Sequence, residues 1–291
     1  MRHAQGPLLT IDLTERTAST TRIDDRLASF VGGRGLNTSL AYDRIPFDAD
    51  PLGPENRLFL STGPMQYSTT SYTGRMAATG LSPLTNGLCS SNAGGFLSRN
   101  FTGAGYAAVE LVGASDELLA VHVREIGPDG EPDVTFEAVD DLAETEVSAV
   151  SDRFAETHEL EPEHVACVGP AGENRVKYAT IASDGGDHHA GRGGAGAVMG
   201  AKRLKAVVAR GSPPELSPEV AALRADYERR YRDTDVGRWH AASATLETVD
   251  FADEVGVLST RGWQEGSFDG AGDIGIEAVK EAAVDRERDE A

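Results

Sequence analysis

The chain has 291 residues, 40% of them hydrophobic, which is enough for one large domain or two ordinary ones with a real core. Its 47 acidic residues outnumber its 27 basic ones, and the formal net charge is -20. A field of this sign opposes nucleic-acid binding, so we expect no nucleic-acid partner. Only four basic residues are lysine. A surface rich in Asp and Glu but poor in Lys predicts a halophilic protein, with an ordinary acidic cytosolic protein as the alternative.

The sequence gives no sign of secretion or of a membrane span. The N-terminal residues lack an apolar core of signal-peptide length, and no apolar run is long enough to cross a bilayer. Cys89 and Cys167 lie far apart without C-x-x-C spacing, so neither a disulfide framework nor a metal site follows from them. We expect both to be buried small hydrophobes in a cytoplasmic protein.

Short strand-like runs dominate the first 211 residues. Helical periodicity appears at 36–42, at 144–158 and after Gly194, without regular alternation between strands and helices, and this favours an α+β fold. The turn at 128–130 predicts a hairpin. The predicted strands are 9–13, 57–61, 76–79, 107–111, 119–124, 134–138, 164–168, 176–182 and 205–209.

The composition changes near residue 212. A Pro-rich segment, 212–218, reads as a linker, followed by a polar helix over 219–232 and an acidic helix from about residue 276. About eighty such polar residues make a poor free-standing core. We therefore expect a domain over 1–211 and, over 212–291, the incomplete start of a mainly helical second domain.

The most informative stretch is 184–202, which reads D-G-G-D-H-H-A-G-R-G-G-A-G-A-V-M-G-A-K and precedes a predicted strand. Glycine lets successive backbone N–H groups turn toward one point, and a helix N-terminus behind them adds to the attraction for an anion. Arg192 adds a planar fork of donors that suits phosphate oxygens. This loop predicts a site for a phosphorylated ligand.

The same letters allow two other interpretations. Gly191, Gly193 and Gly196 satisfy G-x-G-x-x-G, the dinucleotide fingerprint, but the next predicted strand ends in Arg210-Gly211-Ser212 without the acidic residue that would take the ribose hydroxyls. A nicotinamide-dependent reductase stays open as an alternative. A merely structural glycine turn is the second.

Three further clusters combine glycine with polar residues. Each alone is typical of a turn, but several Arg–Gly loops in one strand-rich domain indicate a large ligand with more than one phosphate. Asn92 offers an amide to a pterin or base edge. The clusters are Gly32-Gly33-Arg34-Gly35, Thr73-Gly74-Arg75 and Ser90-Ser91-Asn92-Ala93-Gly94-Gly95-Phe96.

These motifs resemble the tungsten-containing aldehyde:ferredoxin oxidoreductases. The order and spacing match along nearly all of residues 8–211, and G-x-L-S-T-R-G-W-Q-E-G-S-F (256–268) resembles the family's next domain. The matching motifs are G-G-R-G-L (32–36), D-P-L-G-P-E-N (50–56), T-G-P (62–64), T-G-R (73–75), S-P-L-T (82–85), S-N-A-G-G-F (91–96), A-G-Y (104–106), G-P-A-G-E-N (169–174) and A-G-R-G-G-A-G-A-V-M-G-A-K (190–202).

The resemblance implies an N-terminal domain of two β-sheets that cradles a tungsten (or molybdenum) bis-pterin, with mainly helical domains closing over it. It implies cofactor contacts from Arg75, from Asn92, Ala93 and Gly94, and from Gly191 and Arg192. A magnesium ion that bridges the two pterin phosphates would take an oxygen atom of Asn92. No residue of this chain is assigned a catalytic role by the resemblance.

The chain departs from the family pattern upstream of Gly191. Asp187-His188-His189-Ala190 stands where the family usually has R-A-A, with one extra residue. His188 then occupies a cofactor-contact position, and His189 the position whose backbone carbonyl oxygen reaches the magnesium. Replacement of side chains with the backbone contact kept is the simpler interpretation, because magnesium prefers oxygen ligands.

A second departure concerns the family's 4Fe-4S cluster, whose C-x-x-C-x-x-x-C ligands are absent here. Four thiolates are needed, and the chain has two cysteines, both misplaced. The expected function is the cofactor-binding part of an enzyme that oxidises a small aldehyde with water to a carboxylate and passes electrons to ferredoxin, inactive alone. A partner chain carrying the remaining helical domains is a further expectation. The alternative is a non-catalytic subunit or remnant that keeps the fold as a binding module.

Overall fold

The computed structural model describes residues 6–64, 66, 74–212, 218–242 and 246–282. It divides the chain into two compact units, Met1–Leu216 and Ser217–Ala291. Thr73 of the T-G-R motif and most of the expected linker, 213–217, lie outside the described residues.

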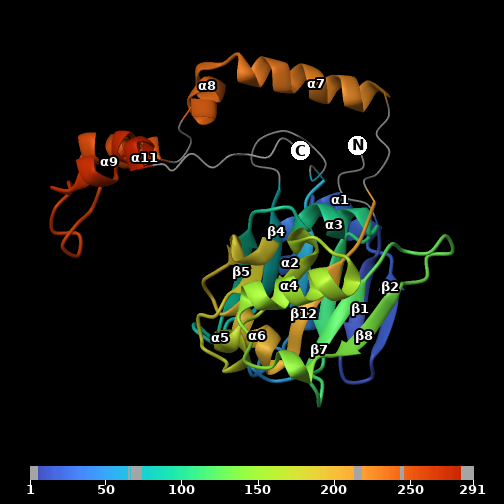
Figure 1. Cartoon of the computed structure of the whole chain (residues 1–291). Coiled ribbons are helices and arrows are strands. Elements are labelled where there is room, and N and C mark those ends of the chain that lie inside the picture. Colours follow the sequence, from blue (N-terminus) through green and yellow to red (C-terminus); the bar gives the residue numbers. More distant parts are fainter. Residues whose placement is uncertain (1–5, 65, 67–73, 213–217, 243–245, 283–291) are drawn as a thin grey trace. The chain divides into compact units, whose positions relative to one another are not determined.

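The first unit contains two six-stranded mixed sheets with helices on their outer faces (Figure 1). The first sheet has the order β2-β1-β6-β3-β4-β5 and the second the order β11-β10-β9-β12-β7-β8. The predicted α+β unit of two sheets with few helices is confirmed. Its strands are β1 (Leu8–Asp12), β2 (Thr17–Thr21), β3 (Leu58–Thr62), β4 (Met76–Leu81), β5 (Leu88–Ala93), β6 (Ala108–Val112), β7 (Leu119–Val123), β8 (Val134–Ala138), β9 (Val165–Cys167), β10 (Ile181–Ser183), β11 (His188–Ala190) and β12 (Leu204–Ala209).

The two sheets repeat one topology, because adding six to each strand number of the first gives the order of the second read from its other end, β8-β7-β12-β9-β10-β11. In each sheet an antiparallel hairpin (β1–β2 or β7–β8) pairs in parallel with the last strand, and all other pairs are antiparallel. Helices follow the same plan, since α2 and α4 come after the hairpins and α3 and α6 come before the last strands. The helices are α1 (Asp24–Ser29), α2 (Gly33–Arg44), α3 (Leu97–Gly103), α4 (Val147–His158), α5 (Pro170–Glu173) and α6 (Ala195–Ala201), with short 3-10 turns η1 (Asp140–Leu142), η2 (Pro162–His164) and η3 (Asp184–Gly186).

Because successive side chains along each strand point to opposite faces, the apolar ones form three hydrophobic layers. Leu9 and Ile11 of β1 face Val121 and Val207 of the other sheet in a shared central core. Leu8 points the other way and packs with the α2 side chains, as period-two side-chain direction requires. On the outer face of the second sheet, Val150 and Phe154 of α4 cover Ala120, Cys167, Ala206 and Val208. The first unit is therefore a helix–sheet–sheet–helix sandwich.

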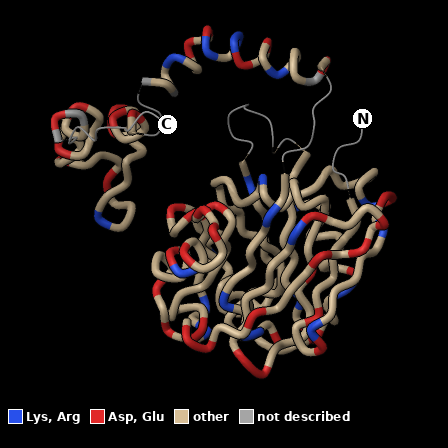
Figure 2. Tube along the Cα trace, turned by 45° about the vertical axis from the view of Figure 1, so that its right-hand side comes forward, with Lys and Arg blue, Asp and Glu red and all other residues tan. Residues whose placement is uncertain are grey.

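Charge is distributed over the outside of this sandwich. Figure 2 shows acidic residues concentrated in the outer turns of the first unit. The carboxylate of Glu110 in β6 is fully buried, and the guanidinium groups of Arg44 and Arg57 approach it at 2.9 and 2.6 Å. Pairing of this kind is what makes a buried charge tolerable.

The second unit is helical, with α7 (Pro218–Arg232), α8 (Asp235–Ala242), α9 (Glu247–Glu254), α10 (Ala271–Ile274) and α11 (Ile276–Ala282). Among its apolar residues whose burial is described, only Ala271 is buried, whereas Leu223, Phe251 and Trp263 are strongly exposed. These helices therefore gain little stability from a core of their own.

One predicted strand is wrong over most of its length. Of the run 176–182, only Ile181 and Ala182 enter a strand, β10. The preceding residues form a turn in which the Ala179 amide donates to the Val176 carbonyl, and the Ala179 carbonyl accepts from the Gly196 amide at 3.0 Å. Apolar content alone did not separate a strand from a turn packed against α6.

Candidate functional site

Three strand ends meet at one edge of the first sheet. Thr62, the last residue of β3, is paired with Met76, the first residue of β4, and Met76 is paired in turn with Ala93, the last residue of β5. Antiparallel pairing thus places Arg75 beside the end of β5, next to Gly94. The loops also touch, since a side chain at Gly74 would come 2.7 Å from the carbonyl oxygen of Gly95.

The first glycine cluster lies at the same edge. Gly32 is so close to the end of β3 that a Cβ there would lie 2.6 Å from the Thr62 carbonyl oxygen, and the Ser61 hydroxyl donates to the Gly33 carbonyl at 3.0 Å. The twelve-residue helix α2 starts here, and its first N–H groups have no intrahelical acceptor. Arg34 in the first turn of α2 is exposed. Helix N–H groups and an exposed guanidinium favour an anion.

The second sheet contributes β11, which contacts β5. A side chain at Gly94 would come 3.1 Å from Nδ1 of His188, and one at Gly95 would lie 2.5 Å from its Cδ2 and overlap the Asp184 carboxylate. Gly95 has a φ of +88°, a conformation that glycine adopts readily. The turn after β5 is therefore built to lie against His188.

The loop that follows β11 then runs back along β5. The hydroxyl of Ser91 donates to the main-chain carbonyl of Arg192 at 2.6 Å. Gly193, with a φ of +77°, lies where a side chain would overlap Sγ of Cys89. Gly191 and Arg192 are therefore held alongside the strand that carries Asn92.

The predicted residues thus gather at the edge where β4, β5 and β11 meet. Arg75 and Arg192 are exposed, and among the described residues neither has a carboxylate within salt-bridge distance. In a chain with 20 more acidic than basic residues, two exposed guanidinium groups on adjoining loops are suited to bind anionic groups. Of the other predicted residues, Ala93 is buried, His189 is exposed, and Asn92, Gly94, His188 and Gly191 are half-buried.

The two histidines differ in surroundings. Successive side chains of a strand point to opposite faces, so the rings of His188 and His189 diverge. The His189 ring is hydrogen-bonded through Nδ1 to the Thr180 hydroxyl at 2.8 Å. The predicted role of His189 needs only its backbone oxygen and is compatible with this bond.

Asp184 is a positioning residue that the sequence alone did not reveal. Its Oδ1 accepts a hydrogen bond from the Phe96 amide at 2.7 Å, while its buried Oδ2 has no hydrogen-bond partner among the described residues. Asp184 therefore holds the turn that follows Asn92. Its only sequence signal was its place at the start of the glycine-rich stretch.

The cysteines depart in part from expectation. Cys167 is buried, as predicted, and burial raises the pKa of its thiol to about 12, so it stays protonated. Cys89 is half-exposed rather than buried, because β5 is the edge strand of its sheet; the loop at Gly193 packs against its sulfur atom.

The dinucleotide alternative loses support. That fingerprint needs a parallel β-α-β unit. Here the strand before the loop, β11, pairs antiparallel with β10, and the strand after α6, β12, pairs with β9 and β7. The glycines of 191–196 therefore do not lie in a dinucleotide-binding crossover.

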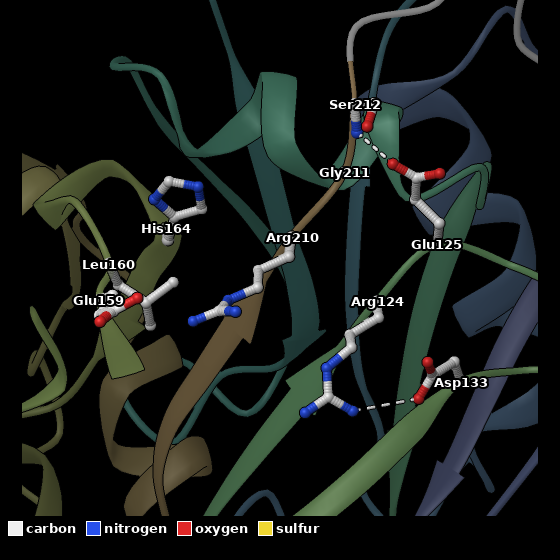
Figure 3. A pocket seen from close by; sticks show the side chains of 9 residues that line it. All are labelled: Arg124, Glu125, Asp133, Glu159, Leu160, His164, Arg210, Gly211 and Ser212. Atoms are coloured by element: carbon white, nitrogen blue, oxygen red, sulfur yellow. Dashed lines mark hydrogen bonds and ion pairs between the residues drawn. The ribbon is translucent and has the colours of Figure 1, made fainter. Parts of the chain in front are cut away.

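A separate hollow of about 520 Å³ lies at the ends of β7 and β12 (Figure 3). Its two arginines already have partners, since Arg124 pairs with Asp133 at 3.2 Å and Arg210 donates to the His158 carbonyl. None of the predicted site residues is among its lining residues, which are Arg124, Glu125, Asp133, Glu159, Leu160, His164, Arg210, Gly211 and Ser212.

Comparison with known proteins places the chain among oxidoreductases. It is 29% identical over 281 residues to a tungsten-containing aldehyde ferredoxin oxidoreductase of Pyrococcus abyssi, covering 94% of this chain and 45% of that protein. A protein of the same name from Thermococcus kodakarensis is also 29% identical, with the same coverage. The WOR-like subunit of an aliphatic sulfonate oxidoreductase of Pyrococcus furiosus is 33% identical, over 74% of this chain and 35% of that protein.

A family model and a solved structure give the same assignment as these relatives. The chain belongs to the aldehyde ferredoxin oxidoreductase family, since the model of that family's N-terminal domain matches residues 8–211. A solved structure, the active-site complex BamBC of benzoyl coenzyme A reductase with 1,5-dienoyl-CoA, superposes with a TM-score of 0.70 and 31% identity, covering 80% of this chain and 36% of that one. The chain thus spans less than half the length of the relatives it matches. Within the described residues, no helix is long and apolar enough to cross a membrane.

Proposed function

We propose that this chain is the cofactor-binding part of an enzyme that oxidises an aldehyde to a carboxylate. The observation that carries the proposal is the convergence of Arg75, the turn after Asn92, and the Gly191–Arg192 loop at one edge. Each loop alone would be an ordinary turn. Together they offer exposed guanidinium groups and the backbone N–H groups of glycine-rich turns to one ligand with several phosphates.

The names of the relatives support a tungsten cofactor, and the proposed form is a tungsten (or molybdenum) bis-pterin. The topological repeat fits a ligand with two similar halves, because each sheet presents a glycine loop at the same place, before α3 and before α6. When bound, this group would supply the two-electron redox chemistry.

The chain's own residues would hold and orient that group. Arg75 and Arg192 would bind phosphate oxygens, and Asn92, Ala93 and Gly94 would contact the pterin. His188, His189 and Gly191 would complete the contacts from the second sheet. A magnesium ion between the phosphates would take oxygen atoms of Asn92 and of the His189 main chain, in keeping with its preference for oxygen.

Electron transfer to ferredoxin is part of the proposal and needs residues besides these. A 4Fe-4S cluster takes four thiolates, and the 291 residues contain two cysteines, one of them buried and protonated. We expect the isolated 291-residue chain to show no aldehyde-dependent dye reduction. A partner chain that carries the cluster would be needed for aldehyde-dependent dye reduction.

The proposal is tested by metal and pterin content after expression in a host supplied with tungstate. We expect tungsten (or molybdenum) and pterin phosphate to copurify with the chain, and Arg75→Ala and Arg192→Ala to lower the content at least about tenfold each, since charge-assisted bonds contribute about 1.5–3 kcal/mol apiece. Arg153→Ala on α4, whose side chain lies 3.8 Å from Asp141, is the matched control. Equal contents in all four proteins would overturn the proposed site.

A further inference from the structure

Three potential metal ligands meet on the outer face of the second sheet, away from the candidate cofactor site. Ala120 of β7 is paired with Glu137 of β8, and His122 with Thr135, so His122 and Glu137 point to the same face. Helix α4 packs on that face, and His158 is its last residue. Figure 1 shows α4 lying over the second sheet.

The ligand atoms are close together. Nε2 of His122 lies 2.7 Å and Nε2 of His158 lies 3.0 Å from the same carboxylate oxygen, Oε2 of Glu137. One ligand atom from each of the three residues falls within 4.8 Å of the others. The His122 side chain is 8% exposed, while those of Glu137 and His158 are about 30% exposed, so the cluster is anchored in the core and open to solvent on one side.

The surrounding packing fixes the rings. Phe154 meets His122 edge-on at 5.8 Å between ring centroids and stacks on His158 at 5.7 Å. Arg210 donates to the His158 main-chain carbonyl and so fastens the end of α4. Ligands held on two strands and a helix are better preorganised than ligands on loops.

We propose that His122, Glu137 and His158 form a site for a divalent first-row transition cation, with Zn²⁺ as the best-suited ion. Two imidazole nitrogens and one carboxylate oxygen form a ligand set that zinc accepts with water in the fourth position. Magnesium and calcium prefer oxygen ligands and fit less well. With metal–ligand distances of about 2.0–2.2 Å, tetrahedral ligand atoms lie about 3.3–3.6 Å apart. Both imidazole nitrogens would therefore move slightly away from Oε2 of Glu137, and the widest pair of ligand atoms, now within 4.8 Å, would move closer together.

The bound ion would fasten the β7–β8 hairpin, at the edge of its sheet, to the C-terminal end of α4. Two neighbouring arginines already have partners, since Arg124 pairs with Asp133 and Arg210 donates to the His158 carbonyl. The site uses no residue assigned to the tungsten cofactor. It can therefore be present or absent whatever the outcome for the proposed function.

The test is a titration of the 291-residue chain, stripped with a chelator, with Zn²⁺ against a chromophoric competitor. We expect one saturable site whose affinity falls at least about tenfold in Glu137→Gln and in His158→Gln. His164→Gln is the matched control and should bind as the parent does, because His164 contacts the Glu161 carbonyl and lies outside the cluster. Circular dichroism of the metal-free proteins establishes that each variant is folded.

A second measurement needs no variant. Co²⁺ bound to two imidazoles, a carboxylate and water should give the intense visible absorption of a four-coordinate ion, and added Zn²⁺ should abolish it. Weak, octahedral-type absorption, the lack of a saturable Zn²⁺ site, or equal affinity in the parent and His158→Gln would each overturn the proposal. The cluster would then be a carboxylate that accepts hydrogen bonds from two histidines and nothing more.

Discussion

The hydroxyl of Ser91 donates a 2.6 Å hydrogen bond to the main-chain carbonyl of Arg192, 101 residues further along the chain. This bond joins β5, which carries Asn92, to the loop that carries Gly191 and Arg192. It is thus a direct link between the contributions of the two sheets to the candidate cofactor site.

Removing this link should loosen the site. We expect Ser91→Ala to lower the free energy of unfolding by about 1–3 kcal/mol, because the Arg192 carbonyl loses its partner in a part-buried position. Ser29→Ala is the control, since that hydroxyl contacts the Asp25 carbonyl on an exposed helix and its loss should change stability by less than about 0.5 kcal/mol. Urea unfolding of the three proteins measures the difference. Equal losses in both variants would show that the bond has no special structural role.

The turn after Asn92 should tolerate no side chain at Gly95. Gly95→Ala combines a positive φ with overlap onto the Asp184 carboxylate, and we expect a loss of about 3–5 kcal/mol. Gly130→Ala has a similar φ, +84° against +88°, but open space around the new Cβ, so only the backbone strain of about 1–2 kcal/mol remains. The difference between the two variants isolates the contact. Identical unfolding curves would mean that Asp184 moves away at no cost.

Lys202 should make stability depend on pH. Its amine donates to the carbonyls of Asn56 and Gly113 while burial, with Arg57 nearby, lowers its pKa from 10.5 to about 8. Between these values the unfolded chain binds more protons than the folded one, so stability rises with pH. The lysine's contribution to this rise is about 3 kcal/mol, since one pKa unit corresponds to about 1.4 kcal/mol.

This contribution is isolated by comparing the free energies of unfolding of the parent protein and of Lys202→Met as a function of pH. We expect the parent to gain stability relative to the variant as the pH is raised from about 8 to about 10.5. The raised pKa of the buried Tyr106 phenol acts equally on both proteins and cancels. Parallel pH profiles for the two proteins would contradict the assignment.

The excess of acidic residues should make the fold depend on salt. At about 0.1 M salt the repulsion among 20 net negative charges reaches about 10 Å, and at about 1 M only about 3 Å. We expect the urea midpoint to rise with KCl over this range while the slope of the unfolding line stays constant. A midpoint that is flat or falls would argue against the halophilic interpretation.

Much of the fold was predictable because apolar alternation marks its buried strands. β1, β3, β4, β6, β7, β8, β9 and β12 lie within about two residues of their predicted positions, and the helix α4 lies inside its predicted range, 144–158. β2, β5 and β11 were missed, since Thr17–Thr21, Leu88–Ala93 and His188–Ala190 lack an apolar pattern and join their sheets mainly through backbone hydrogen bonds. The repeat of one topology in two sheets was also invisible, because it is a property of pairing and not of residue type.

The candidate site, too, could be predicted from the sequence only in part. Its glycines and arginines were identified from the sequence because each anion-binding loop is a short continuous segment whose residue types indicate its chemistry. The contact of Gly94 with His188, the hydrogen bond from Ser91 to Arg192 and the role of Asp184 depend on which strand ends meet, and residue types alone do not determine that. The cluster of His122, Glu137 and His158 was missed for the same reason, since its members come from three separate elements.

The most direct test of the account is the position of the metal. Crystals of the chain, purified with its cofactor from a tungstate-supplied host, should give an anomalous difference peak at the tungsten absorption edge. The account predicts this peak beside the loops that carry Arg75, Asn92 and Arg192, where β4, β5 and β11 meet. A peak in the hollow lined by Arg124 and Arg210, or one bound only on an outer face of either sheet, would contradict it.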